Sequence, residues 1–148
     1  MQLTRSGEYG LKGVLFLARQ PREKFVLLSE ISKYQHIPEP FLAKIFQRLS
    51  KAGLLRSARG SKGGFCLAKP HGSITMREVI ETIDGPIALN RCLRREGECD
   101  EEGLCPIYEV WSKAQNQLLE ILESTTVEDL ARRMIRNEKK SREEVRHR

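Results

Sequence analysis

The sequence predicts a mainly α-helical fold with one small β-hairpin and a long helix near the C-terminus. Apolar residues recur every three or four positions in several segments, which is typical of amphipathic helices. Only two short β-like runs lie close enough to pair as a hairpin, and a glycine-rich loop joins them. The chain has 148 residues, of which 39% are hydrophobic and 31% are charged, so we expect one domain with a modest core.

The first predicted helix spans residues 3–19, has an apolar face and stops before Pro21. A β-like run over residues 25–28 follows it. Ser29 is then a suitable N-cap for a short second helix, because its hydroxyl can accept hydrogen bonds from the free amides of the first turn. The segment 35–38 ends this second helix.

A third helix is predicted from Pro40, which is tolerated in a first turn, to about Ala52, with Gly53 as the C-terminal cap. Two short helices joined by a tight turn form a helix-turn-helix. The expected buried stripe of the third helix consists of Phe41, Leu42, Ile45, Phe46 and Leu49. Its outer face carries Ala43, Lys44, Gln47, Arg48 and Lys51. Such a helix fits the major groove of DNA, although the same residues are common on ordinary surface helices.

Two strands, at residues 54–57 and 65–68, are predicted to pair around a basic, glycine-rich loop. A hairpin directly after a helix-turn-helix indicates the wing of a winged-helix domain, here residues 1–86. Glycines let the loop turn sharply and approach phosphates, while Arg59 and Lys62 supply positive charge. A nucleotide-binding loop is the competing interpretation, but the loop matches neither common phosphate-binding pattern.

A fourth helix is predicted after Ser73 or Thr75, and it ends before a loop over residues 87–105. Pro106 then starts a long helix whose stripe is too long for the small winged domain to cover. The stripe comprises Ile107, Val110, Trp111, Ala114, Leu118, Ile121 and Leu122. We therefore predict that residues 106–136 are dimerisation helices with Trp111 in the dimer core, and packing onto the chain's own first helix is the alternative. Residues 137–148 are predicted to be a basic disordered tail.

The charges are unevenly distributed along the chain. Residues 1–70 hold 13 Lys and Arg against 4 Asp and Glu, whereas residues 71–131 hold 5 against 13. A basic N-terminal half is expected of a protein that binds a polyanion, because neutralised phosphates release their counterions. The competing interpretation is a solvated basic surface.

Three cysteines, Cys92, Cys99 and Cys105, stand at C-x6-C-x5-C within an acidic loop. Thiolates gathered this closely can hold an iron–sulfur cluster or zinc, or act as a redox thiol set. No apolar run approaches the length of a membrane span, and the N-terminus lacks a signal-peptide pattern, so we expect a cytoplasmic protein. In a reducing cytosol such cysteines are ligands or redox thiols rather than structural disulfides. The fourth cysteine, Cys66, is expected to be buried in the wing.

Several short runs together resemble a known family. These are Leu28 to Ile31, Ile37-Pro38, Phe41 to Ile45, Ala52 to Leu55, Ser57 to Gly60, Gly63 to Ala68, Asp84 to Pro86 and the three cysteines. The sequence is similar to the Rrf-type winged-helix transcription regulators, the IscR- and NsrR-like group. The resemblance covers roughly residues 1–130.

This resemblance implies a homodimer that binds an inverted-repeat operator in double-stranded DNA, as a repressor or an activator. It also implies a [2Fe-2S] or [4Fe-4S] cluster held by Cys92, Cys99 and Cys105, with Glu8 as the candidate fourth ligand and His36 and His71 as weaker ones. The candidate DNA contacts are Ser29, Pro40, Ala43, Lys44, Gln47, Arg48 and Lys51, together with Arg59, Gly60, Ser61, Lys62 and Gly63 of the wing.

Other functions fit the sequence less well. It contains no Ser/His/Asp set, no paired-carboxylate cleft and no nucleotide-binding fingerprint, so we expect neither an enzyme nor a small-molecule substrate. The remaining alternative is a winged-helix regulator whose cysteine loop holds zinc or switches by disulfide formation without a metal.

Overall fold

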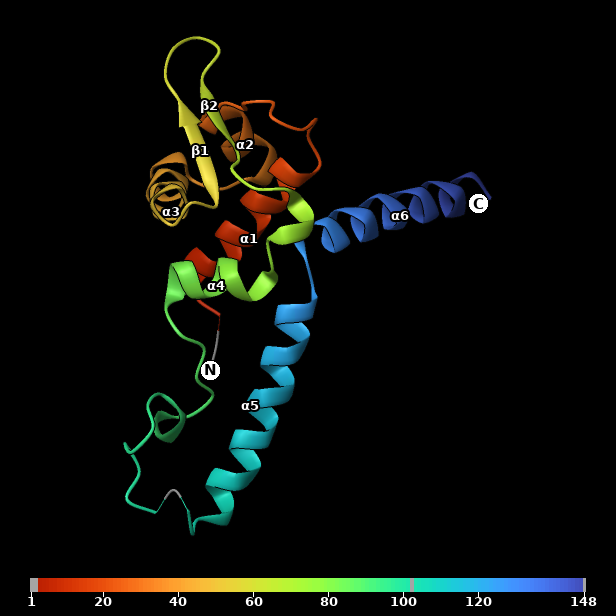
Figure 1. Ribbon diagram of the computed structural model, residues 1–148. Helices are drawn as coiled ribbons and strands as arrows, with labels where there is room; N and C mark the ends of the chain where they lie inside the picture. Colours follow the sequence, from red (N-terminus) through yellow and green to blue (C-terminus); the bar gives the residue numbers. More distant parts are fainter. Residues whose placement is uncertain (1–2, 102, 148) are drawn as a thin grey trace.

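A computed structural model describes residues 3–101 and 103–147, and it confirms a mainly helical fold with one small hairpin. The helices are α1 (Arg5–Ala18), α2 (Leu28–Gln35), α3 (Glu39–Lys51), α4 (Met76–Asp84), α5 (Pro106–Ser124) and α6 (Val127–Arg146). The strands are β1 (Leu55–Ala58) and β2 (Gly64–Leu67), and two single 3-10 turns are η1 (His71–Ser73) and η2 (Arg91–Leu93). Figure 1 shows a body formed by α1 to α4 and the hairpin, from which α5 and α6 extend.

One hydrophobic core joins the helix-turn-helix to the wing. Leu42, Phe46 and Leu49 of α3 are fully buried, as is Ile31 of α2. The ring of Phe46 meets that of Phe65 on β2 edge to face, with the centroids 5.1 Å apart. The predicted packing of the third helix is therefore confirmed for these residues, and it fixes α3 relative to the hairpin.

Phe41 is an exception to the predicted stripe, because 59% of its surface is exposed. It lies in the first turn of α3, where Leu42 alone fills the core and is 0% exposed. A residue at the margin of a stripe is buried only if another element covers that end of the helix. The prediction that Phe41 is buried was wrong.

The wing pairs antiparallel, with Leu55 opposite Leu67 and Ala58 opposite Gly64. The predicted strand at 25–28 is reduced to a single bridge between Val26 and Phe65, because α2 already begins at Leu28. The N-cap of α2 is consequently Leu27, which offers no capping hydrogen bond, and the prediction that Ser29 caps this helix was wrong.

A stripe of glycines brings α1 unusually close to its neighbours. Gly7, Gly10 and Gly13 recur every third residue and are all buried. A Cβ at position 10 would lie 2.1 Å from a terminal carbon of Ile83 on α4, and one at position 13 would lie 2.6 Å from the Phe46 ring. Only hydrogen at these positions permits the observed packing of α1 against α3 and α4.

We expect Gly13→Ala to lower the free energy of unfolding by up to about 2 kcal/mol, because the added methyl overpacks a rigid, buried ring at a cost of about 1–3 kcal/mol. This cost should outweigh the gain of roughly 1 kcal/mol in helix propensity. Chemical denaturation of the variant beside Lys12→Ala, an exposed change on the same helix, measures the effect. A Gly13→Ala protein as stable as the control would contradict the packing described.

Helix α5 has two kinds of apolar surface. Near its C-terminal end, Leu118 and Leu122 pack against Ile80 of α4 and Ile87 of the following segment. The exposed apolar residues are Ile107 (63%), Val110 (68%), Trp111 (42%) and Ile121 (62%). Part of the predicted stripe thus packs within the chain, and the rest faces solvent. No helix within residues 3–101 and 103–147 is long and apolar enough to cross a membrane.

Helix α6 continues to Arg146, so the prediction that it ends near residue 136 was wrong, and residues 137–146 of the predicted disordered tail are helical. Position 148 of that predicted tail lies outside the described residues. A capping box starts the helix, since Thr126 accepts from the Asp129 amide and Asp129 accepts from the Thr126 amide. Glu138 then receives two hydrogen bonds of 2.8 Å from Arg19 at the end of α1. This long-range pair holds α6 against the body beyond the predicted end.

Candidate nucleic-acid interface and cysteine loop

The outer face of α3 presents the residues that the sequence predicts for DNA contact. Lys44, Gln47 and Lys51 are exposed, as is Pro40 in the first turn, and Ala43 is half-buried. Ser29 on α2 is also exposed. A helix anchored on one face by Leu42 and Phe46, with Lys and Gln on the other, has the form that enters a major groove.

Arg48 differs from these residues. Its guanidinium donates a 3.1 Å hydrogen bond to the carbonyl of Ile83, in the last turn of α4. The side chain is thereby turned toward a neighbouring helix, although the residue as a whole is exposed. A carbonyl at a helix C-terminus is a favourable partner for a cation.

The wing places four of its five predicted contact residues at the surface. Arg59, Gly60, Ser61 and Lys62 are exposed, whereas Gly63 is buried and donates from its amide to the Gly60 carbonyl at 3.0 Å. Gly60 has a φ of +102°, which side chains rarely adopt. The turn therefore holds Arg59 and Lys62 outward, while Gly63 closes it.

Replacing Arg59 by Ala is expected to weaken operator binding and reduce the slope of log affinity against log salt by about one, because one phosphate contact is lost. Titration of a duplex selected from a randomised library, at several salt concentrations, measures both quantities. Arg136→Ala on the distant α6 serves as the control for a simple change in net charge. An Arg59→Ala protein with an unaltered salt slope would rule out the wing contact.

The three loop cysteines come from different local structures. Cys92 lies in η2, Cys99 in the irregular part of the loop, and Cys105 at the N-cap of α5. All three are free thiols and half-buried. Cys66, in contrast, is 2% exposed within β2, so its predicted burial is confirmed. Its sulfur accepts a hydrogen bond from the Arg56 guanidinium at 3.7 Å.

The protomer does not gather these thiols into a finished metal site. Among residues 3–101 and 103–147, no three His, Cys, Asp or Glu side chains converge closely enough to hold a metal ion. The candidate ligand Glu8 instead forms a 2.8 Å ion pair with Lys12 one turn along α1. The hydrogen bond and charge of Lys12 lower the pKa of the Glu8 carboxyl, so Glu8 is a carboxylate at neutral pH.

The two weaker candidate ligands, His36 and His71, both make contacts within the fold. His36 has a φ of +54° at the C-cap of α2, and its backbone amide donates to Ser32, so it forms the turn of the helix-turn-helix. His71 lies 3.8 Å from a carboxylate oxygen of Glu128, at the junction with α6. Neither residue belongs to a group that could hold a metal ion in the described part of the chain.

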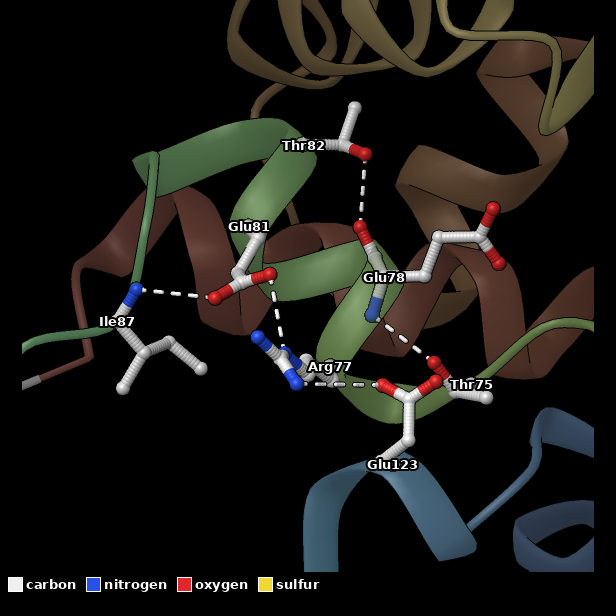
Figure 2. A network of polar contacts seen from close by, with 7 residues as sticks. All are labelled: Thr75, Arg77, Glu78, Glu81, Thr82, Ile87 and Glu123. Atoms are coloured by element: carbon white, nitrogen blue, oxygen red, sulfur yellow. Dashed lines mark hydrogen bonds and ion pairs between the residues drawn. The ribbon is translucent and has the colours of Figure 1, made fainter. Parts of the chain in front are cut away.

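The start of the cysteine loop is fixed by polar contacts with α4 and α5. The Ile87 amide donates to Glu81 at 3.1 Å, and the other carboxylate oxygen of Glu81 accepts from Arg77 at 3.1 Å (Figure 2). Arg77 also lies 3.8 Å from Glu123 on α5. Two residues further on, the Leu89 amide donates to the Gln115 side chain of α5 at 2.9 Å.

Sequence reasoning did not identify these anchors or the contact of Arg48. The partners of Leu89 and Arg48 are 26 and 35 residues away in sequence, and polar residues on amphipathic helices give no signal of a specific acceptor. The glycine spacing in α1 was a readable signal, since three glycines every third residue on one helix face indicate close helix packing.

Comparison with known proteins adds independent information. A sequence model of the Rrf2 family, described as an iron-dependent transcriptional regulator, matches residues 3–133. The HTH-type transcriptional regulator IscR of Photorhabdus laumondii is 35% identical over 130 residues, which cover 88% of this chain and 79% of the relative.

Solved structures are similar over most of the chain. CymR, the global cysteine regulator of B. subtilis, has a TM-score of 0.76 at 30% identity, with 88% of this chain and 96% of that chain covered. IscR from T. potens has a TM-score of 0.74 at 27% identity, with 90% and 88% covered. These proteins are transcriptional regulators rather than enzymes.

Proposed function

The chain belongs to the Rrf2 family of DNA-binding transcriptional regulators, and from this premise we propose that it acts as a homodimer whose operator affinity depends on an iron–sulfur cluster. The observation that carries this proposal is the set of three free, half-buried thiols at C-x6-C-x5-C in the one loop that leads into α5. The operator is proposed to be an inverted repeat, because a two-fold dimer presents its two recognition helices symmetrically.

The exposed stripe of α5 supports the dimer. Ile107, Val110 and Ile121 each leave more than 60% of their surface in solvent on one protruding helix. A second copy of the same helix would cover them, since a two-fold axis pairs identical surfaces. Figure 1 shows α5 extending from the body with the cysteine loop at its start, so dimer contact and loop lie together.

The donor chemistry of the loop fits a cluster. Cys92, Cys99 and Cys105 are unpaired by disulfides, and thiolates are the usual ligands of iron–sulfur clusters. Cys105 stands at the positive end of the α5 dipole, which favours an anionic ligand there. Closure of the loop around the cluster would bring the three residues to one centre. A bound cluster would supply a group that responds to nitric oxide, oxygen or iron supply.

We propose Glu8, from either protomer, as the fourth ligand. It is ionised and exposed, and it forms an ion pair with Lys12 on the same helix. An oxygen ligand binds a soft cluster weakly, so the three thiolates of Glu8→Ala should still hold iron. Because the fourth ligand is missing, this variant should lose its iron faster on exposure to air. The decay of visible absorbance measures this rate, with Glu30→Ala as the control. Equal decay rates would remove Glu8 from the ligand set.

A second candidate function is a regulator with a zinc site or a thiol switch. It is favoured by the separation of the thiols in the described residues of the protomer, and by the likeness to CymR, a global cysteine regulator. In this case two cysteines of the loop would form a disulfide, or three would hold zinc.

Anaerobic purification followed by assays for iron, acid-labile sulfide and zinc tests the proposal. The cluster proposal predicts a coloured protein with iron and sulfide in comparable amounts. A colourless protein with stoichiometric zinc would favour the zinc site. A colourless, metal-free protein that gains a disulfide among the loop cysteines on oxidation would favour the thiol switch.

A further inference from the structure

The last turn of α4 is a junction between three parts of the molecule. Its Ile83 carbonyl accepts the hydrogen bond from Arg48 on α3 at 3.1 Å. Its Asp84 carboxylate accepts from the Thr4 amide at 3.3 Å and also from the Thr4 hydroxyl, at the start of α1. Gly85 follows directly and leads into the cysteine loop. A movement of this turn would therefore reach both the recognition helix and the start of α1.

Arg48 stands at the edge of the DNA-facing surface of α3. It follows Lys44 by one helical turn but also lies three residues after the buried Ile45, on the side of the helix that faces α4. Lys44, Gln47 and Lys51 have no such hydrogen bond to α4 among the contacts of the described residues. The guanidinium of Arg48 is thus hydrogen-bonded to the C-terminal end of α4. This bond would have to break before Arg48 could contact a DNA phosphate.

The same helix also holds the start of the cysteine loop. Glu81 accepts the Ile87 amide with one oxygen and Arg77 with the other, and Arg77 reaches Glu123 of α5 (Figure 2). Ile87 is itself 6% exposed and packs with Ile80. Displacement of Ile87 must consequently displace α4 or break these contacts.

The close packing around α4 means that a displacement of α4 would also displace its neighbouring helices. At Gly10, the backbone of α1 is so close to Ile83 that an added Cβ would lie 2.1 Å from its terminal carbon. Closely packed interiors transmit small shifts rather than deform continuously. The loop and α3 are therefore both connected to the C-terminal half of α4, through polar contacts at Glu81 and at Ile83 two residues further on.

We propose that α4 transmits the state of the cysteine loop to the recognition helix, and that Arg48 is a coupling residue rather than a DNA contact. This inference rests on the proposed function, in which the loop changes state. When the loop closes on its ligand, Ile87 and Glu81 shift the last turn of α4, and the Ile83 carbonyl repositions Arg48 and with it α3. A coupling residue changes the ratio of operator affinities between the two loop states and leaves the number of phosphate contacts unchanged.

The test compares Arg48→Met with Lys44→Ala, in cluster-loaded and cluster-free protein, on the selected operator. For Arg48→Met we expect the ratio of the two affinities to fall from at least about fivefold to less than about twofold, with an unchanged salt slope. For Lys44→Ala we expect weaker binding in both states, a slope smaller by about one and an unchanged ratio. An Arg48→Met protein with a smaller slope and the wild-type ratio would make Arg48 a phosphate contact and overturn the proposal.

A second variant and a DNA-independent measurement cover the case in which Arg48→Met is unstable. Glu81→Ala removes the acceptor of the Ile87 amide without touching α3, and it should lower the ratio to the same extent. Hydrogen exchange of α3 amides should differ between the two loop states in the wild type and not in Glu81→Ala. A Glu81→Ala protein that keeps the wild-type ratio and exchange difference would overturn the coupling route alone. Equal affinity of the wild type in both states would instead overturn the proposed function, and the coupling with it.

Discussion

Val110→Glu is expected to convert the protein from a dimer into a monomer and to reduce its operator affinity by at least about 100-fold. Val110 is 68% exposed and belongs to the apolar stripe of α5, in the N-terminal half of the helix. A carboxylate there would be buried without a partner at a two-fold contact, and it would face its own copy nearby. Loss of the second recognition helix removes the gain of roughly 10²- to 10⁴-fold that linked binding sites provide.

Sedimentation measures the oligomeric state of Val110→Glu, and operator titration measures its affinity for DNA. Asn116→Glu provides a matched control, because it adds the same charge to an exposed position on the opposite face of α5. The control should remain dimeric and bind DNA with nearly wild-type affinity. If Val110→Glu stayed dimeric at micromolar concentration, the dimer contact would have to lie on another surface.

Cys99→Ser is expected to reduce bound iron after anaerobic reconstitution to background. A serine hydroxyl is a poor substitute for a thiolate on iron, and two remaining cysteines cannot retain a cluster that three were needed to hold. Cys66→Ala is the control, because Cys66 is buried in β2 and lies outside the loop. It should keep its iron at the cost of a modest loss of stability.

Iron content and visible absorbance of the two reconstituted variants test this prediction. Full iron loading in Cys99→Ser would show that Cys99 is not a ligand. Equal iron loss in Cys66→Ala would point to a general loss of folding rather than of a ligand, and thermal unfolding of both variants would separate these causes.

Local pattern was sufficient to predict most of the fold. The periodicity of Leu42, Ile45, Phe46 and Leu49 predicted α3, because a helix that buries one face must repeat its apolar residues every three or four positions. The glycine-rich loop after it predicted the wing. Such features depend on residues that are neighbours in sequence.

The errors arose where distant residues decide the structure. The length of α6 depends on Glu138 meeting Arg19, 119 residues away, and a polar, charged segment gives no sign of that pair. Likewise, the exposure of Phe41 depends on what covers the end of α3. The contact between Arg48 and the Ile83 carbonyl could not be predicted from the outer face of a helix, because that face resembles a DNA-binding one.

For the cysteine site, the sequence predicts which residues are donors but not how they are arranged in space. Spacing identifies Cys92, Cys99 and Cys105 as a donor set, because thiolates are the chemistry that such a loop offers. Under the proposed function their geometry depends on a bound ligand and on a second subunit, neither of which is encoded in local pattern. The free thiols of the protomer are therefore consistent with a site that forms only on loading.

The central claim is that a cluster on the cysteine loop sets the affinity for DNA. Its most direct test is to titrate one anaerobic preparation against the selected operator twice, once with the cluster and once after the cluster has been removed. We predict dissociation constants that differ by at least about fivefold. Identical constants in a preparation with full iron and sulfide content would contradict the account.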